Sequence, residues 1–154
     1  MLRNRDTFQI LFQNIQCIRN KINLLEAALS KLNFDCLCFS EHWLLSLECD
    51  NKHLCDFETA SFFARSVHTH GGVMQLINNS MEYTALPWIK DMSLEKICEL
   101  TGIKLTKYNL IIVTVYRSPK SDIKKFLHIV NDLLNKLKYN SYNIILGGDF
   151  NVHF

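Results

Sequence analysis

The chain has 154 residues, of which 48% are hydrophobic and 21% are charged, a balance typical of one folded domain with a sizeable core over residues 1–154. The formal net charge of +2 neither requires nor excludes a nucleic-acid partner. The sequence has no run of about 18 apolar residues and no signal-peptide pattern, so we expect no membrane partner and an intracellular protein, nuclear or cytoplasmic and not secreted. Its six cysteines lack the paired spacing of a zinc site, which favours reduced thiols in the core.

The first predicted strand covers residues 8–18 and carries a polar pair near its end, Asn14 and Gln16. A period of two places both side chains on one face. Such a pair marks either the solvent side of an edge strand or the floor of a binding site. From this strand alone we favour the edge, because antiparallel sheets are often solvated on one face.

A strand-helix-strand unit begins with this strand. Apolar residues recur at steps of three and four over residues 20–32, which predicts an amphipathic helix, and residues 36–39 form a short apolar strand that leads to Glu41. A right-handed crossover makes the two strands parallel, so Asn14 and Glu41 should meet where open α/β sheets bind ligands. A lone glutamate after a strand is otherwise usually a solvated loop residue.

Residues 45–70 give the weakest pattern of the chain. His68 and His70 have a spacing that could ligate a metal, but no third ligand stands at a recognisable spacing, so we expect both in a loop. Residues 71–77 then form a predicted strand, and a turn leads to a hairpin partner over residues 81–86.

The central predicted strand covers residues 108–116. It is almost continuously apolar, which indicates burial on both faces, and it should pair with a long antiparallel strand over residues 94–105. Tyr116 and Arg117 stand at its end, so a hydroxyl and a guanidinium would emerge at the mouth of the sheet.

The last elements are a helix over residues 121–138, with Ser121 as its predicted N-cap, and a short buried strand over residues 143–146. Two glycines follow, where we expect the backbone to turn sharply, and then Asp149 and Asn151. An aspartate can hold a divalent cation or take a proton from water, and an asparagine can donate to a phosphate oxygen. Because Gly-Gly-Asp alone more often closes a turn, this interpretation depends on partners elsewhere in the chain.

Polar residues after four predicted strands give the chain a resemblance to the endonuclease/exonuclease/phosphatase superfamily. Within it, the chain resembles the apurinic/apyrimidinic-like endonuclease domain of non-LTR retrotransposons of the LINE type, in particular the jockey-like ones. The resemblance covers the whole chain, and it is specific because five blocks agree in order and separation: QNIQCIRNK (13–21), SEHWL (40–44), GGV (71–73), VYRSP (115–119) and GGDFN (147–151).

This resemblance implies a four-layer α/β sandwich, in which two mixed sheets pack face to face with helices outside. It also implies a phosphodiester hydrolase that depends on Mg²⁺ or Mn²⁺ and acts on DNA. Glu41 would be the principal metal ligand and Asn14 would support it. A carboxylate suits this role because it offers a hard oxygen to a hard cation.

The resemblance also implies roles for the later residues. Tyr116 would donate to a non-bridging phosphate oxygen, Asp149 would orient or deprotonate the attacking water, and Asn151 would hold the phosphate. Such donors stabilise charge on the equatorial oxygens. Arg117 is a further candidate for substrate binding.

Two departures from the family pattern bear on activity. Many relatives have a carboxylate where this chain has Gln16, which leaves the metal region poorer in charge. Relatives also continue to a terminal Ser-Asp-His, whereas this chain ends at Phe154, and His153 is too close to Asp149 to replace that histidine. We therefore expect a sandwich that is incomplete at the C-terminus and comprises the N-terminal two thirds of the domain.

Two functions remain open on the sequence alone. The first is a DNA endonuclease derived from a non-LTR retrotransposon, associated with a reverse transcriptase and impaired by truncation, that nicks its target site. The alternative is a non-catalytic relic fragment, or a weak module that binds nucleic acid or protein. A lipid phosphatase of the same superfamily fits the blocks around Glu41 and Tyr116 less well.

Overall fold

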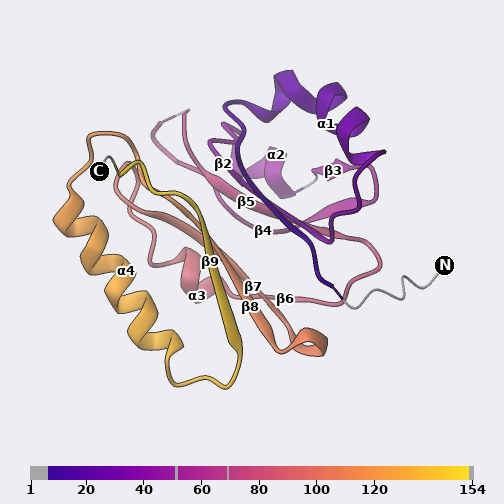
Figure 1. Cartoon of the computed structure of the whole chain (residues 1–154). Helices are drawn as coiled ribbons and strands as arrows, with labels where there is room; N and C mark the ends of the chain where they lie inside the picture. Colours follow the sequence, from indigo (N-terminus) through magenta and orange to yellow (C-terminus); the bar gives the residue numbers. More distant parts are fainter. Residues whose placement is uncertain (1–6, 51, 69, 153–154) are drawn as a thin grey trace.

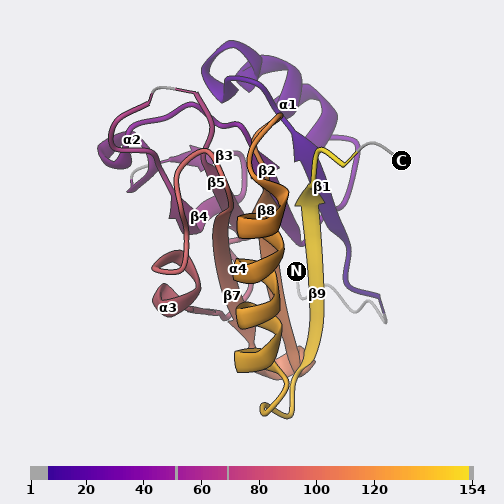
Figure 2. The same ribbon diagram turned by 90° about the vertical axis from the view of Figure 1, so that its left-hand side faces the viewer.

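The structure of the protein is a computed structural model, and it describes residues 7–50, 52–68 and 70–152. Two sheets pack face to face, with helix α1 (Ile22–Leu29) outside one and helix α4 (Ile123–Leu137) outside the other (Figures 1 and 2). The expected four-layer α/β sandwich is therefore confirmed. Within the described ranges, no helix is long and apolar enough to cross a membrane.

The first sheet contains five strands within the described residues, in the order β1-β2-β5-β4-β3. Strands β1 and β2 are parallel, as the crossover through α1 predicts, and β5 is antiparallel to β2. The elements of this half are β1 Ile10–Asn14, the 3₁₀ helix η1 Ile18–Lys21, β2 Cys36–Ser40, helix α2 Ser46–Asp50, β3 His53–Leu54, β4 Phe57–Phe63 and β5 Val73–Asn78.

The second sheet has the order β6-β7-β8-β9 in the part of the chain that the structure describes. Strands β7 and β8 form the expected antiparallel hairpin, and β9 is parallel to β8. The elements of this half are β6 Thr84–Ala85, helix α3 Pro87–Lys90, β7 Glu99–Leu105, the 3₁₀ helix η2 Thr106–Tyr108, β8 Leu110–Tyr116 and β9 Asn143–Asp149.

The core consists of three apolar layers, because successive side chains of a buried strand point to opposite faces. In β8, Ile112 packs between the two sheets, whereas Val113 packs beneath α4. In β2, Cys38 packs between the sheets and Phe39 contacts the layer beneath α1. All cysteines except Cys55 are buried, which confirms their predicted place in the core.

Two predicted elements are wrong. The first strand ends at Asn14 and does not reach residue 18, because Gln16 and Cys17 adopt positive φ angles of 41° and 73° that end an extended strand. Asn14 and Gln16 thus do not share a strand face. The hairpin over residues 81–86 does not form either, since β6 pairs with β7 in the other sheet.

Several boundaries also differ from their predictions. Strand β7 begins at Glu99, because Leu94 and Cys98 pair with each other in a tight turn. The N-cap of α4 is Asp122 and not Ser121: its carboxylate accepts hydrogen bonds from the backbone N–H groups of the first turn. The expected turn at the two glycines is absent, since β9 continues through them to Asp149.

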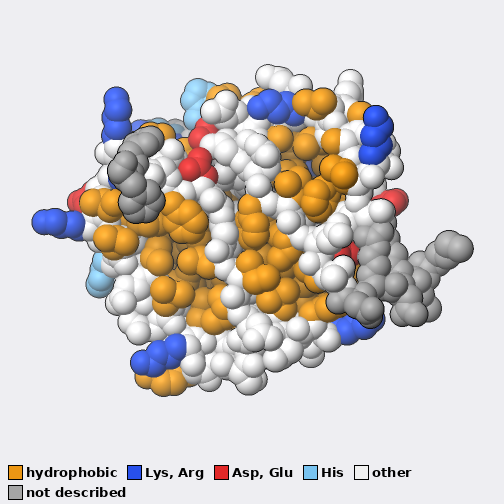
Figure 3. All heavy atoms as spheres, viewed as in Figure 1, with side chains coloured by type: hydrophobic (Ala, Val, Ile, Leu, Met, Phe, Trp, Pro, Cys, Tyr) orange, Lys and Arg blue, Asp and Glu red, His pale blue; other side chains and the backbone are white. Residues whose placement is uncertain are grey.

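Strands β1 and β9 are the end strands of the two sheets and lie side by side. A Cβ atom on Gly147 would lie 2.5 Å from the Phe12 ring, so this glycine permits close approach of the two strands. Hydrophobic side chains gather over α4 and neighbouring β9 (Figure 3), where Ile144 and Ile145 are 36% and 37% exposed.

Candidate active site

Four strand ends, two from each sheet, bring together the side chains that the sequence pattern singled out. The strands β1 and β2 are parallel, and so are β8 and β9, so each pair delivers its last residues to one edge. The two edges adjoin because β1 packs against β9. The side chains that meet there are Asn14, Glu41, Tyr116 and Asp149.

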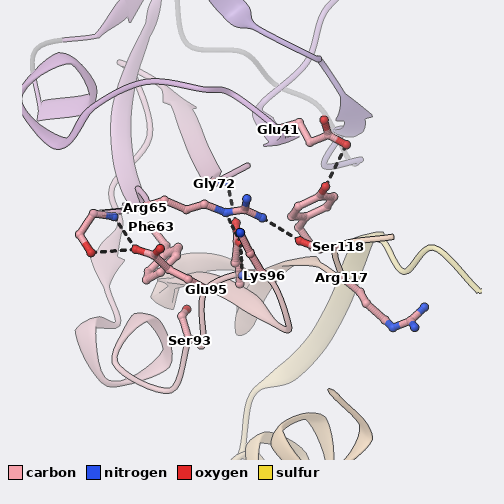
Figure 4. A network of polar contacts seen from close by, with 12 residues as sticks. Glu41, Phe63, Arg65, Gly72, Ser93, Glu95, Lys96, Arg117 and Ser118 are labelled. Atoms are coloured by element: carbon pink, nitrogen blue, oxygen red, sulfur yellow. Dashed lines mark hydrogen bonds and ion pairs between the residues drawn. The ribbon is translucent and has the colours of Figure 1, made fainter. Parts of the chain in front are cut away.

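Asn14 is the centre of this group. Its amide nitrogen donates to Glu41 Oε1 at 2.8 Å and to Asp149 Oδ2 at 2.8 Å, which links residues from the two sheets. The hydroxyl of Tyr116 donates to the same Glu41 oxygen at 3.1 Å (Figure 4). The predicted meeting of Asn14 with Glu41 is thus confirmed, and both carboxylates lie within one hydrogen-bonded cluster.

The backbone at Glu41 is held in an unusual conformation. Glu41 and Trp43 have φ angles of 56° and 58°, in the left-handed region that costs a non-glycine residue about 1–3 kcal/mol. Their N–H groups donate to the carbonyls of Gly72 and Gly71 at 2.8 and 3.1 Å. The loop before β5 therefore fixes the direction in which the Glu41 carboxylate leaves β2.

The pKa of the Tyr116 hydroxyl is raised. Burial is the main cause, and the negative charge of Glu41 adds to it. Tyr116 consequently stays protonated near neutral pH and acts as a hydrogen-bond donor.

Asn151 and Arg117 form a second pair beside the cluster. The Asn151 amide donates to the Arg117 carbonyl at 2.6 Å, and the Arg117 guanidinium donates to the carbonyls of Asn151 and Ser121 at 2.6 and 2.7 Å. The buried Arg117 side chain points away from Glu41 (Figure 4). Both residues anchor the segment after Asp149, and their predicted contacts with substrate stay predictions.

The sequence pattern missed a buried ion pair behind the cluster. Arg65 Nε donates to Glu99 Oε1 at 2.6 Å, and these side chains are 7% and 0% exposed. Gly72 N donates to the other Glu99 oxygen at 2.6 Å, and Arg65 also donates to Ser118 Oγ at 2.7 Å (Figure 4). One signal existed: Glu99 lies on the apolar face of the predicted strand over residues 94–105.

The Arg65–Glu99 ion pair supports the cluster through Tyr116 and Gly72. Glu99 stands opposite Tyr116 in the β7–β8 hairpin, and the Arg65 guanidinium lies 5.9 Å from the centre of the Tyr116 ring. Gly72, which donates to Glu99, accepts from the backbone N–H of Glu41. Burial raises the pKa of Glu99, while Arg65 and the Gly72 N–H favour its charged form.

The histidines near the cluster have structural positions. His42 is buried: its Nδ1 accepts from Leu44 N at 2.9 Å, so the ring proton is on Nε2, which contacts the Phe63 carbonyl at 3.0 Å. Burial lowers the pKa of His42 to about 4, so the ring is neutral at pH 7. His68 and His70 lie in the loop between β4 and β5, as predicted, and His70 stacks against Trp43.

Comparison with solved structures places this arrangement among known folds. The structure of the 3′ phosphatase NExo from Neisseria bound to product DNA hairpin matches with a TM-score of 0.68 and 15% identity, over 95% of this chain and 58% of that one. TDP2 of D. rerio complexed with single-strand DNA product matches with a TM-score of 0.67 and 15% identity, over 97% and 63%. The chain has the endonuclease/exonuclease/phosphatase fold.

A retrotransposon domain also has this fold. The endonuclease domain of TRAS1, a telomere-specific non-LTR retrotransposon, matches with a TM-score of 0.63 and 13% identity, over 96% of this chain and 61% of that one. The chain thus spans 58% to 63% of the length of these three structures. No protein-family model matches the sequence, and no curated protein matches it.

The carboxylates of Glu41 and Asp149 offer hard oxygens, the ligands that divalent cations such as Mg²⁺ prefer. The described residues contain no group of three or more His, Cys, Asp or Glu side chains that could hold a metal. Mg²⁺, however, is usually bound by one or two carboxylates together with water and substrate phosphate. Glu41 fits this role, because its Oε2 accepts no hydrogen bond from the described residues.

The predicted metal role of Asn14 is more indirect in this structure. Its amide nitrogen faces the carboxylates of Glu41 and Asp149, whereas its oxygen accepts from Gln16 N at 3.2 Å. Asn14 as placed supports Glu41 by a hydrogen bond. Direct ligation by its oxygen would require the amide to turn, and it stays a prediction.

Proposed function

We propose that the chain carries the catalytic centre of a metal-dependent DNA endonuclease of the non-LTR retrotransposon type, which nicks its target DNA. The observation that carries the proposal is the Asn14 amide, which joins Glu41 from one sheet to Asp149 from the other. Two carboxylates and a tyrosine hydroxyl at one edge provide a metal ligand, a base for water and a phosphate donor.

Each residue of the cluster has a separate task in this proposal. Glu41 holds Mg²⁺ or Mn²⁺, which when bound supplies Lewis-acid polarisation of the phosphate. Tyr116 donates a hydrogen bond to a non-bridging oxygen, for which its raised pKa suits it. Asp149 orients the attacking water and accepts its proton, and the hydrogen bond from Asn14 holds the Asp149 carboxylate in place.

DNA as the substrate is supported by two kinds of likeness. Two of the matched structures, those of NExo and TDP2, contain DNA, and a third is a retrotransposon endonuclease domain. The blocks around Glu41 and Tyr116 resemble the retroelement branch more than the lipid phosphatases. We further propose that the chain corresponds to the N-terminal part of such a domain.

Nicking of supercoiled plasmid tests the proposal. We expect the purified chain to convert supercoiled DNA to the open circle in Mg²⁺, and Glu41→Gln and Asp149→Asn to slow this conversion by at least about 10²-fold. Asp132→Asn, an exposed change on α4, is the matched control and should nick at the parental rate. A folded chain whose nicking is insensitive to Glu41→Gln would contradict the proposal.

A non-catalytic binding module is the second candidate. It is favoured by the internal hydrogen bonds of two site amides, since Asn14 is bound to both carboxylates and Asn151 is bound to the Arg117 carbonyl. These amides would have to change partners to reach a metal or a phosphate. A folded chain that binds DNA in Mg²⁺ or Mn²⁺ but never nicks it would support this candidate.

A further inference from the structure

A basic pocket of about 370 Å³ adjoins the active-site cluster. Tyr116 belongs to both, because it helps to line the pocket while its hydroxyl donates to Glu41. The pocket therefore lies next to the proposed cleavage site. The other lining residues used below are Arg65, His70, Lys96, Ser118 and Lys120.

The charge of the pocket is positive. No aspartate or glutamate is among its lining residues. The charge of Arg65 is balanced by Glu99, but the exposed side chains of Lys96 and Lys120 form no ion pair with any described residue. Two lysines without an ion-pair partner among the described residues thus line a space together with a histidine and hydroxyl groups, a composition that suits an anion.

The pocket is also rigidly built. The Arg65 guanidinium at its wall is 7% exposed and is fixed on two sides, by Glu99 and by Ser118. Lys96 and Lys120 both have left-handed backbone conformations, with φ angles of 64° and 60°. Such conformations are strained in a non-glycine residue and are concentrated at ligand sites.

We propose that this pocket binds a phosphate of the nucleic-acid strand next to the phosphate that is cleaved. This inference rests on the proposed function, which places the reacting phosphate at Glu41 and Asp149. A strand held there passes Tyr116, so the adjoining nucleotide reaches the pocket. Its volume lies within the roughly 300–1,000 Å³ of small-ligand sites, enough for a phosphate and its sugar.

The pocket complements the charge of the cleavage site. Without a cation, the carboxylates of Glu41 and Asp149 repel a phosphate, whereas Lys96 and Lys120 attract one without any metal. The pocket therefore supplies the affinity for DNA that persists when divalent metal is removed. A free phosphate or mononucleotide presents the same chemistry, so the test compares both with a polynucleotide.

Anisotropy of a fluorescent single-stranded oligodeoxynucleotide, titrated with the chain in EDTA at several salt concentrations, tests the inference. We expect Lys96→Ala with Lys120→Ala to weaken binding and to reduce the slope of log K against log salt by about 0.7, because the two lysines bind one phosphate and each lost phosphate contact on a single strand contributes about 0.7. The control is Lys31→Ala with Lys138→Ala, which removes equal charge outside the pocket and should leave the slope unchanged.

Equal slopes for the pocket variant and the control would overturn the inference. Competition by inorganic phosphate or a mononucleotide as effective, per phosphate, as an unlabelled oligonucleotide would overturn it too, because the pocket would then bind free anions. Glu41→Gln separates this result from the proposed function: it should not nick but should bind with the parental slope. A slope effect without any nicking would support the pocket and contradict the nuclease.

Discussion

Two carboxylates at the same end of the sheets differ in how completely they are paired. Both oxygens of Glu99 accept hydrogen bonds, from Arg65, Gly72 N and Lys96 N, and its side chain is 0% exposed. Among the described residues, only one oxygen of half-buried Glu41 accepts hydrogen bonds. Complete burial keeps a ligand away from Glu99, whereas Glu41 is partly exposed, so we expect Glu99 to govern stability and Glu41 to govern activity.

The largest expected effect is on stability, from breaking the buried pair. Glu99→Leu leaves the Arg65 guanidinium buried without its partner and should lower the free energy of unfolding by about 3–5 kcal/mol. Urea denaturation measures this loss. Adding Arg65→Leu should recover part of it, since the unpaired charge is then removed.

The exposed pair of Arg19 and Glu48 is the matched control for this experiment. These side chains are 44% and 38% exposed, so Arg19→Met should change the free energy of unfolding by at most about 1 kcal/mol. Equal losses of unfolding free energy from Glu99→Leu and Arg19→Met would contradict the structural role assigned to Glu99.

The next effect is on activity, with little change in stability. Glu41→Gln keeps the size of the side chain but removes the charge that holds the metal, and we expect the nicking rate to fall by about 10²–10³-fold. The midpoint of urea unfolding should be unchanged or higher, because Glu41 and Asp149 both accept from the Asn14 amide and the substitution removes one of these two negative charges. A lower midpoint together with unchanged nicking would reverse the roles assigned to Glu41 and Glu99.

Acid should destabilise the fold through His42. Its pKa is about 4 in the fold against 6.5 when exposed, so between these values the unfolded chain binds a proton that the folded chain does not. Stability should therefore fall by up to about 3 kcal/mol as the pH drops from 6.5 to 4, and His42 should contribute no change above 6.5.

Urea unfolding across this pH range measures the effect. His42→Gln should flatten the profile between pH 6.5 and 4, whereas His128→Gln, at an exposed position of α4, should leave it unchanged. Identical profiles for the parent and His42→Gln would show that other groups carry the acid sensitivity.

The smallest effect concerns the edge strand β9. Its outer edge pairs with no strand of the described ranges, and Ile145 is 37% exposed, which favours association with a second copy. Ile145→Lys should reduce the self-associated fraction in sedimentation velocity and change the free energy of unfolding by at most about 0.5 kcal/mol. Val67→Lys, at a 78% exposed loop position, should not alter association.

The residue pattern was sufficient to predict one contact of the polar cluster, the one between Asn14 and Glu41. Strand-helix-strand patterns are local, and their handedness is fixed, so the meeting of Asn14 and Glu41 follows from the order of residue types along the chain. In the second sheet, the parallel strands β8 and β9 place Tyr116 and Asp149 at one edge, whereas the expected roles of these two residues came from the family resemblance.

The bracing behind the cluster could not be predicted in the same way. Arg65 lies in the part of the chain with the weakest pattern, and its pairing with Glu99 depends on how the two sheets pack. The end of β1 could not be predicted either, because the residue types of Gln16 and Cys17 do not indicate a positive φ angle. Hydrophobic patterns with a period of two or 3.6 residues predict strands and helices, whereas contacts between distant loops produce no periodic pattern in the sequence.

The contact of Phe12 with Gly147 has a consequence for how the sequence of this chain can evolve. Asn14 and Asp149 lie two residues further along the same two strands, so the thickness of the Phe12 ring sets the spacing between them. A larger residue at position 147 would need a smaller one at position 12 to preserve that spacing. These two positions should therefore covary in size among homologous sequences, although neither side chain takes part in the chemistry.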